Sequence, residues 1–283
     1  MLSTMRPNDP MPMGPHATQA RGVVGFCANA VAPDGDQDLR PAPFEARRMP
    51  GAARLLILGD RTTVAAQIRN RRYARLPDVA IVGPTCRPLM LTVDGPPPVE
   101  IMLSALDWVR LMPMSAALLA DRIVSAADLG LGRLGDAAAI ATDEAAAETA
   151  IASLAETMAA RIPRDPVNEA FIARMTALID DGRVFDTATA AEQVDVRPHH
   201  LRRLTLRAFG FPPKTLLMRR RFLAAFDVFR AGDGDFAAIA AFGYFDASHF
   251  IRDANRFLGT TPRRFVRDLA AIGENGHPGG LLR

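Results

Sequence analysis

The chain has 283 residues, of which 49% are hydrophobic and 23% charged, and its formal net charge is +3. A chain of this length can form one large or two ordinary domains with their own cores, and we expect two. No run of about 18 uncharged apolar residues occurs, which argues against a membrane-spanning helix. The only cysteines, Cys27 and Cys86, are too few for a disulfide framework or a four-thiolate zinc site. We therefore expect a soluble protein of the reducing cytoplasm.

The first part of the chain is predicted to contain a leader and then strands. Residues 1–20 hold four prolines and one arginine, unlike a signal peptide, and are interpreted as a disordered leader. From about 22 to 104, short aliphatic runs alternate with turn residues, as in ARLLILG, DVAIVG, PLMLTV and VEIMLS. This pattern predicts an antiparallel sheet or partial barrel, and thus an α+β protein.

After about residue 104 the sequence favours helices. The segments PMSAALLADRIVSAADL (113–129) and DEAAAETAIASLAETMAARI (143–162) space apolar residues three and four apart. Prolines interrupt the pattern near residue 163, and the next helix is predicted near 167–181, ending at a glycine. We therefore predict an N-terminal sensing or dimerisation domain over 21–163 and an all-helical domain over 164–283.

An internal repeat occupies the last hundred residues. An offset of 49 pairs His200 with His249, Leu201 with Phe250, Arg203 with Arg252, Arg207 with Arg256, Gly210 with Gly259 and Pro213 with Pro262. In each copy a helix leads through a short turn into a second helix, which predicts two helix-turn-helix units near 187–210 and 235–259. Thr187 or Thr189 is expected to start the first unit, and Asp235 and Asp246 to cap the helices of the second.

The segment between the two units is predicted to be one continuous helix. Its apolar residues are Leu216, Leu217, Phe222, Leu223, Phe226 and Phe229, and it is expected to end at residues 232–234. Such a helix fixes the spacing between the units, whereas a flexible tether would be rich in glycine and serine.

Ser248 and His249 are adjacent, but the sequence does not favour catalysis. Neighbouring helix residues do not face each other, no Gly-x-Ser-x-Gly elbow accompanies the serine, and His200 occupies the slot of His249 in the other copy. We interpret both histidines as partly buried structural residues. Only one of the five histidines lies in the first half of the chain, at position 16, so a histidine metal site is not expected there. We predict no enzyme activity, no metal and no cofactor.

A one-sided run of basic residues points to DNA. Residues 166–283 hold 17 basic and 13 acidic residues, and the stretch 197–226 has no acidic residue. In a helix-turn-helix, residues near the start of the second helix meet base edges and the surrounding basic groups contact phosphate. The DNA-binding candidates are His199, Arg202, Arg203 and Arg207 in the first copy, and Asp246, Ser248, Ile251, Arg252 and Arg256 in the second. The phosphate-contact candidates are Arg197, Lys214, Arg219, Arg220 and Arg221.

The second half resembles the DNA-binding domain of AraC/XylS-type transcription regulators. The resemblance rests on HHLRRLTLRAFGFPPKTLL and FAAIAAFGYFDASHFIRDANRFLGTTPRRFVR and covers about 185–268. It implies a sequence-specific regulator that binds double-stranded DNA through two recognition helices, and it adds Ala247 to the DNA-facing residues. Similarity of DVAIVGPTCRPLMLTVDG to the N-terminal domain of these regulators implies a partial cupin-like barrel that binds an effector, dimerises, or both. RNA polymerase and a second copy of the chain are candidate partners, and the effector is unknown.

The sequence departs from the family in the packing of both units. Thr205 and Ala254 stand where phenylalanine is usual, and Phe209 and Phe257 are expected to compensate. Asp253 is expected near the DNA-facing side, where it would oppose phosphate. Trp108, Tyr73 and Cys86 are interpreted as core residues rather than as the lining of a ligand pocket.

Two other functions remain open. One is a DNA-anchored protein-interaction module without sequence-specific regulation. The other is an enzyme fused to the DNA-binding domain, which would need a reactive cysteine.

Overall fold

The computed structural model describes residues 43–59, 61–131, 163–232 and 234–275, together with positions 156 and 160. The predicted leader, Cys27 and most of the predicted helix at 143–162 lie outside these described residues. Glu156 and Ala160 are the described positions of that helix, and both are helical.

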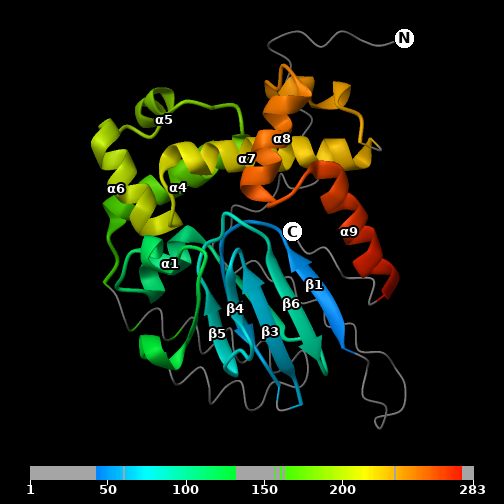
Figure 1. Cartoon of the computed structure of the whole chain (residues 1–283). Helices are drawn as coiled ribbons and strands as arrows, with labels where there is room; N and C mark the ends of the chain where they lie inside the picture. Colours follow the sequence, from blue (N-terminus) through cyan, green and yellow to red (C-terminus); the bar gives the residue numbers. More distant parts are fainter. Residues whose placement is uncertain are drawn as a thin grey trace.

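The described strands form two antiparallel four-stranded sheets (Figure 1). The first has the order β1-β6-β3-β4 and the second the order β7-β2-β5-β8. The strands are β1 (Phe44–Arg48), β2 (Ala53–Ile57), β3 (Thr63–Ile68), β4 (Arg71–Tyr73), β5 (Val79–Val82), β6 (Leu89–Asp94), β7 (Val99–Leu103) and β8 (Ile123–Ser125). The predicted antiparallel β arrangement of the first half is confirmed.

Alternation of side chains sets the register of the first sheet. Leu89, Leu91 and Val93 of β6 are buried, whereas the residues between them are more exposed. On β3 the buried residues are Val64, Ala66 and Ile68, which lie opposite Val93, Leu91 and Leu89. A shift by one residue would move these side chains to the solvent face, so the apolar pattern specifies the pairing.

The two sheets enclose a common core. Leu56 of β2 lies in one cluster with Val64 of β3 and Leu91 of β6, and each is at most 1% exposed. An ion pair also links the sheets, because Arg48 of β1 donates hydrogen bonds of 2.8 and 2.5 Å to Glu100 of β7. The two sheets therefore pack against each other around a shared hydrophobic core.

The second sheet is covered on its outer face by a short helix, α1 (Ala105–Leu111). Ser104 begins this helix with a capping box, in which Ser104 and Asp107 each accept a hydrogen bond from the backbone of the other. Trp108 and Leu111 pack onto the sheet and are at most 1% exposed. Because it is covered on both faces, β2 is buried along its whole length.

The predicted helix at 113–129 is wrong. The structure instead has two 3-10 turns, η1 (Ala116–Leu119) and η2 (Ala127–Leu129), with strand β8 between them. The chain reverses at Asp121, whose φ of 55° is incompatible with a continuing helix. The β-branched pair Ile123 and Val124 then adds β8 to the edge of the sheet beside β5.

The remainder of the described chain is helical. Its elements are α4 (Pro166–Asp181), α5 (Thr187–Gln193), α6 (Pro198–Phe209), α7 (Pro213–Ala231), η3 (Ala237–Phe242), α8 (Ala247–Phe257) and α9 (Pro262–Asn275). The predicted order of an antiparallel β part followed by helices and an all-helical C-terminal part is thus confirmed. No helix among these residues is long and apolar enough to cross a membrane.

Several predicted helix ends are also confirmed. Gly182 ends α4 with a φ of 68°, and Asp246 caps α8 by accepting a hydrogen bond of 2.7 Å from the amide of His249. Asp235 accepts from the amide of Ala237 at the start of η3. The first unit begins differently from the prediction. Asp186, and not Thr187 or Thr189, is the N-cap residue of α5, and its carboxylate accepts hydrogen bonds from the backbone amides at the start of the helix.

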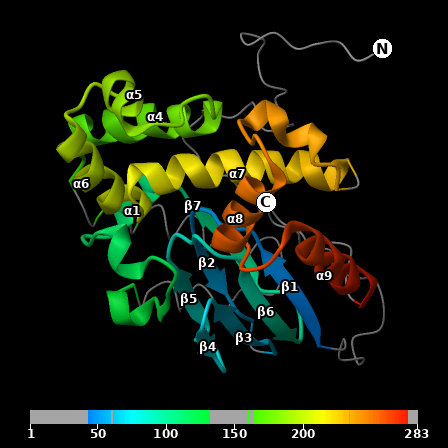
Figure 2. The same ribbon diagram turned by 45° about the horizontal axis from the view of Figure 1, so that its top comes forward.

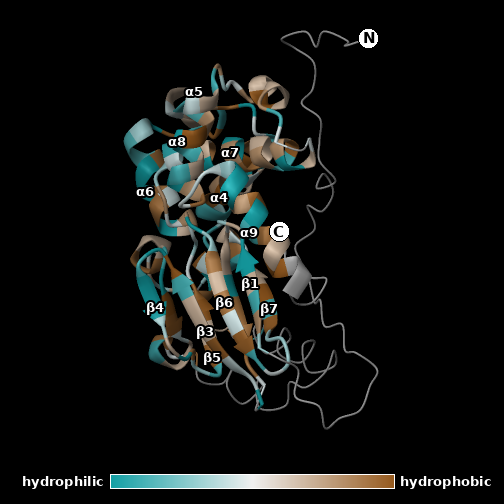
Figure 3. Ribbon diagram, turned by 45° about the vertical axis from the view of Figure 1, so that its right-hand side comes forward, coloured by the Kyte–Doolittle hydropathy of each residue, from teal (hydrophilic) through white to brown (hydrophobic). Residues whose placement is uncertain are grey.

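Helix α7 crosses the molecule between the other helices, with the sheets on one side (Figure 2). It is continuous over 19 residues and contacts α4, α5, α6, η3 and α8. Figure 3 shows hydrophobic residues along the strands and hydrophilic residues on part of the surface of α6 and α8. The predicted connecting helix is therefore confirmed, and its residues hold both helix-turn-helix units.

Candidate nucleic-acid interface

The first unit presents basic residues on one face of α6 and buries the opposite face. Pro198 is the first helical residue, where its missing amide hydrogen costs nothing. Leu201, Thr205 and Ala208 are buried. The exposed residues of the helix include the predicted contacts His199, Arg202, Arg203 and Arg207, so the structure brings these four to the surface of one helix.

The second unit repeats this arrangement on α8. Phe250, Asp253, Ala254 and Phe257 are buried. The predicted contacts Ser248, Arg252 and Arg256 are exposed, whereas Ala247 and Ile251 are partly buried. The exposed residues 248 and 252 are one turn apart and thus lie on one side of the helix.

Small residues fill the two slots where regulators of the AraC/XylS type, which this region resembles, usually have phenylalanine. Thr205 is fully buried, and its hydroxyl donates hydrogen bonds to the carbonyls of Leu201 and Arg202 at 2.9 and 3.1 Å. Ala254 is also fully buried. The buried Thr205 hydroxyl therefore has backbone acceptors, and Ala254 adds no polar group to its unit.

An aromatic cluster packs the second unit onto α7. The ring of Phe222 lies 5.4 Å from that of Phe250 and 5.6 Å from that of Phe257, measured between centroids. Phe226 and Phe229 extend the cluster along α7, and all five rings are at most 1% exposed. Phe257 therefore supplies aromatic packing beside Ala254, as predicted, and α7 supplies the rest. Phe209 of the first unit is only partly buried.

Asp253 is not near the DNA-facing side, which corrects the sequence-based expectation. It is 4% exposed and accepts hydrogen bonds from Arg221 of α7 at 3.0 Å and from the Tyr244 hydroxyl at 2.9 Å. Burial raises the pKa of Tyr244, and the Asp253 carboxylate raises it further. The carboxylate thus holds α8 against α7 and does not oppose phosphate.

Two of the five predicted phosphate contacts are corrected by their internal contacts. Arg219 donates hydrogen bonds to the carbonyl oxygens of Thr85 at 2.7 Å and Gly51 at 3.3 Å, and burial lowers its pKa. Arg221 is engaged by Asp253 and stacks over the Tyr244 ring at 4.7 Å. Both guanidinium groups are thus held by contacts within the protein.

The other three predicted phosphate contacts remain at or near the surface. Arg197 and Lys214 are exposed, at the N-terminal ends of α6 and α7. Arg220 is partly buried and donates a hydrogen bond of 3.2 Å to the carbonyl of Asp180. These positions stay predictions.

The two histidines differ from each other. His249 is partly buried, as predicted, and its ring lies 4.9 Å from that of Tyr244. His200 is exposed rather than partly buried, and its ring lies 4.2 Å from that of His199. The neighbouring His199 is the main cause of a lowered pKa of His200.

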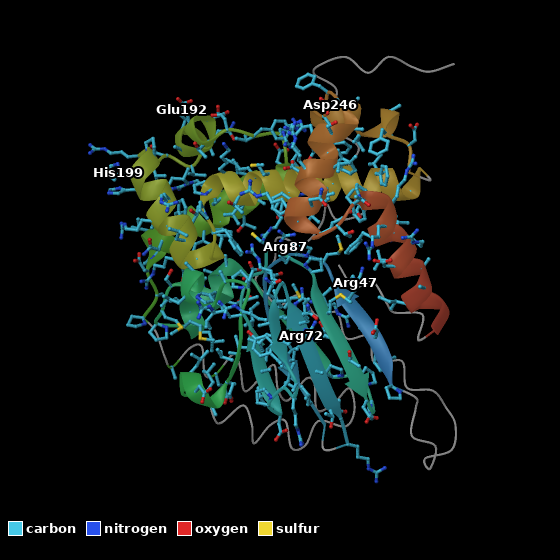
Figure 4. The ribbon with its side chains drawn as sticks, viewed as in Figure 1. Arg47, Arg72, Arg87, Glu192, His199 and Asp246 are labelled. Carbon is cyan, nitrogen blue, oxygen red and sulfur yellow. The ribbon has the colours of Figure 1, made fainter. Side chains whose placement is uncertain are left out.

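The N-terminal ends of α6 and α8 lie on the side of the helical region away from the sheets. Figure 4 shows His199 at the N-terminal end of α6 and Asp246 at that of α8, whereas Arg72 marks the sheet. Helices α6 and α8 lie toward different ends of α7 (Figure 1).

A short loop of the β part, residues 83–87, contacts both units. A side chain at Gly210 would place its Cβ 3.0 Å from Pro84, and one at Gly259 would place it 3.3 Å from Arg87. Arg87 also donates a hydrogen bond of 2.5 Å to the carbonyl of Asn255 in α8. The offset of 49 makes Gly210 and Gly259 equivalent, so the loop contacts the same point of both repeats. No sequence pattern signals this contact, because it joins residues far apart in the chain.

Possible metal ligands do not cluster among the described residues. No group of three histidine, cysteine, aspartate or glutamate side chains in this part of the chain could hold a metal ion. The His249 ring faces Arg221, with 3.3 Å between the Nε2 and Nη2 atoms. Trp108 and Cys86 are buried, as predicted, whereas the partly buried Tyr73 borders an open cavity of about 610 Å³.

Comparison with known proteins finds a family match for part of the helical region. Residues 190–268 match a family described as a helix-turn-helix domain, and the match spans α6, α7 and α8. No curated protein matches the chain. One solved structure of ToxT from Vibrio cholerae is 11% identical, with a TM-score of 0.41, and the alignment covers 80% of this chain and 97% of that one. A structure of ToxT from Vibrio cholerae O395 is 10% identical, with a TM-score of 0.40, and covers 80% and 96%.

Proposed function

We propose that the chain is a sequence-specific regulator of transcription of the AraC/XylS type, and the match of residues 190–268 to a helix-turn-helix family supports this proposal. The observation that carries the proposal is the repeated surface of α6 and α8. Each helix buries its apolar face and exposes an arginine at the equivalent position, Arg203 or Arg252. Arginine can make a bidentate contact with guanine in the major groove.

The proposed reading of DNA uses both helices on one face of the duplex. Successive major-groove segments on one face are about 34 Å apart, and a continuous connecting helix holds two reading helices at a fixed separation. The proposed base and backbone contacts are His199, Arg202, Arg203, Arg207, Ala247, Ser248, Ile251, Arg252 and Arg256, with Arg197, Lys214 and Arg220 on phosphate. Because the two units differ in sequence, a single chain would read an asymmetric site.

We further propose that residues 21–163 form the sensing or dimerising domain and 164–283 the DNA-binding domain. The loop at 83–87 supports a coupling between them, because it contacts α8 through Arg87 and the end of α6 through Pro84. Arg219 of α7 donates to the same loop at Thr85. A ligand that moved this loop would change the relative position of the two reading helices. RNA polymerase and a second copy of the chain stay proposed partners, to be tested by co-purification and sedimentation.

The direct test replaces one arginine in each unit. Arg203→Ala and Arg252→Ala should each weaken binding to the selected DNA site by about 1–3 kcal/mol and relax the preference at one base pair. Arg230→Ala is the matched control, because this α7 arginine pairs with Asp227 at 3.7 Å outside both reading helices. Unchanged affinity and unchanged preference in both test variants would overturn the proposal.

Phosphate contacts are separable from base contacts by their response to salt. Lys214→Ala should weaken binding to all duplexes alike and reduce the slope of log affinity against log salt by about one. Fluorescence anisotropy over a series of salt concentrations measures this slope. A salt slope identical to that of the wild type would remove Lys214 from the interface.

The two alternatives predict different results. A DNA-anchored interaction module would bind random and selected duplexes with equal affinity at moderate salt. An enzyme acting through Cys86 would need an accessible thiolate, yet this side chain is 5% exposed and burial raises the pKa of its thiol to about 11. Cys27 lies outside the described residues, and rapid labelling of either thiol by a methyl donor would favour the enzyme.

A further inference from the structure

Phe245 is almost fully exposed at the start of the second reading helix. It is 95% exposed, the highest value among the large hydrophobic side chains that the structure shows at its surface. It directly precedes Asp246, the N-cap residue of α8. A single exposed leucine is ordinary, but a phenylalanine held in water at a rigid helix end suggests a binding role.

The equivalent residue of the first unit has a structural role that Phe245 lacks. Val196 precedes the N-cap residue of α6 and packs against the cluster that contains Leu201, four residues into the helix. This is the pattern of a hydrophobic staple, in which the residue before the cap packs on the helix. In the second unit the corresponding pair would be Phe245 and Phe250.

Tyr244 replaces Phe245 in that staple. Its ring lies 5.1 Å from the ring of Phe250 in an edge-on arrangement, and the residue is 3% exposed. Its hydroxyl donates to Asp253, which anchors the turn to α8. The fold of the unit is thus complete without the side chain of Phe245.

The turn also fixes where Phe245 lies. Gly243 begins the turn with a φ of 73°, and Asp246 ends it by accepting a hydrogen bond from the backbone amide of His249. With Tyr244 buried between these two points, the backbone of Phe245 is held at the N-terminal end of α8. Ser248, a proposed base contact, lies in the first turn of the same helix end.

We propose that Phe245 is a specificity-determining residue that packs on the C5-methyl group of a thymine at the edge of the site read by α8. The thymine methyl is the apolar group of the major groove, and phenylalanine is one of the side chains that contact it. The inference rests on the proposed DNA-binding function. It adds an apolar contact to a reading helix whose other proposed contacts are mainly polar or basic.

The test uses DNA that differs only in this methyl group. The site is first selected from random duplexes with the full chain, and each thymine is then replaced in turn by deoxyuridine. One replacement should weaken wild-type binding about fourfold, which corresponds to about 0.8 kcal/mol, the value of one buried carbon. Phe245→Ala should bind the thymine duplex about tenfold more weakly and lose the difference between thymine and deoxyuridine.

Three control measurements distinguish a thymine contact from a general loss of apolar surface or of stability. Val167→Ala removes an apolar side chain that is 79% exposed on α4 and should leave both affinities unchanged. Phe245→Leu keeps an apolar group and should retain part of the methyl preference. The thermal midpoint of Phe245→Ala should equal that of the wild type, since a ring that is 95% exposed contributes little packing within the unit.

Three outcomes would overturn the inference while leaving DNA binding intact. In the first, Phe245→Ala binds the selected site with the affinity of the wild type. In the second, it binds all duplexes more weakly but keeps the preference for thymine over deoxyuridine. In the third, only the sedimentation coefficient of the chain changes. The last result would assign Phe245 to a contact between protein molecules. Failure to select any site, in contrast, would refute the proposed function itself.

Discussion

Replacing Asp253 by alanine should destabilise the second helix-turn-helix unit by about 3–5 kcal/mol. The carboxylate is buried between α8 and α7, where it accepts hydrogen bonds from Arg221 and Tyr244. The Arg221 side chain is 13% exposed, and its buried Nε atom already has no hydrogen-bond partner. Removing the carboxylate would leave this cation without a counter-charge and the tyrosine hydroxyl without an acceptor, which is why the cost is large.

Urea unfolding of the full chain, followed by circular dichroism, measures this cost. Asp227→Ala is the control, because Asp227 pairs with Arg230 at 3.7 Å on the surface and its side chain is 47% exposed. That pair should contribute about 0.5 kcal/mol or less. Tyr244→Phe removes only one hydrogen bond and should cost about 1 kcal/mol. If Asp253→Ala and Asp227→Ala destabilised the chain equally, the buried network would not hold the unit together.

Three further predictions concern the contacts between the β part and the helices. Arg219→Ala should lower the thermal midpoint by several degrees without changing the salt slope of DNA binding, whereas Lys214→Ala should do the reverse. Gly210→Ala should cost more than Gly243→Ala in urea unfolding. Both have positive φ and share about 1–2 kcal/mol of strain, but only Gly210 has an atom 3.0 Å from an added Cβ. Burial raises the pKa of the Cys86 thiol from 9.0 to about 11 in the folded chain. As pH rises, the unfolded chain therefore loses this proton at a lower pH than the folded chain does. The wild type should therefore lose about 2–3 kcal/mol of stability between about pH 9 and 11 relative to Cys86→Ala, and equal losses would contradict this.

The features predicted correctly from the sequence are those set by local patterns. The aspartate at 246 and the glycine at 182 act within a few residues of their own position, so their roles follow from spacing. The repeat offset of 49 likewise located both helix-turn-helix units. The short aliphatic runs between turn residues made the antiparallel β arrangement predictable for the same reason.

The features that the sequence did not predict depend on contacts between distant residues. The apolar spacing of 113–129 suits a helix, but the chain reverses at Asp121 and residues 123–125 pair with β5 as a strand. Asp253 and Arg221 both look like surface residues until α8 packs on α7 and joins them. Arg219 looks like a phosphate contact until the loop at Thr85 accepts its hydrogen bonds. In each case the partner lies more than 20 residues away.

Selection of binding sites from random duplex DNA tests the central proposal most directly. The full chain should enrich one asymmetric site with two preferred segments about 10 base pairs apart, centre to centre. Arg203→Ala should relax the preference in one segment and Arg252→Ala in the other. Enrichment of no sequence, or loss of the same segment in both variants, would contradict the assignment of α6 and α8 as two separate reading helices.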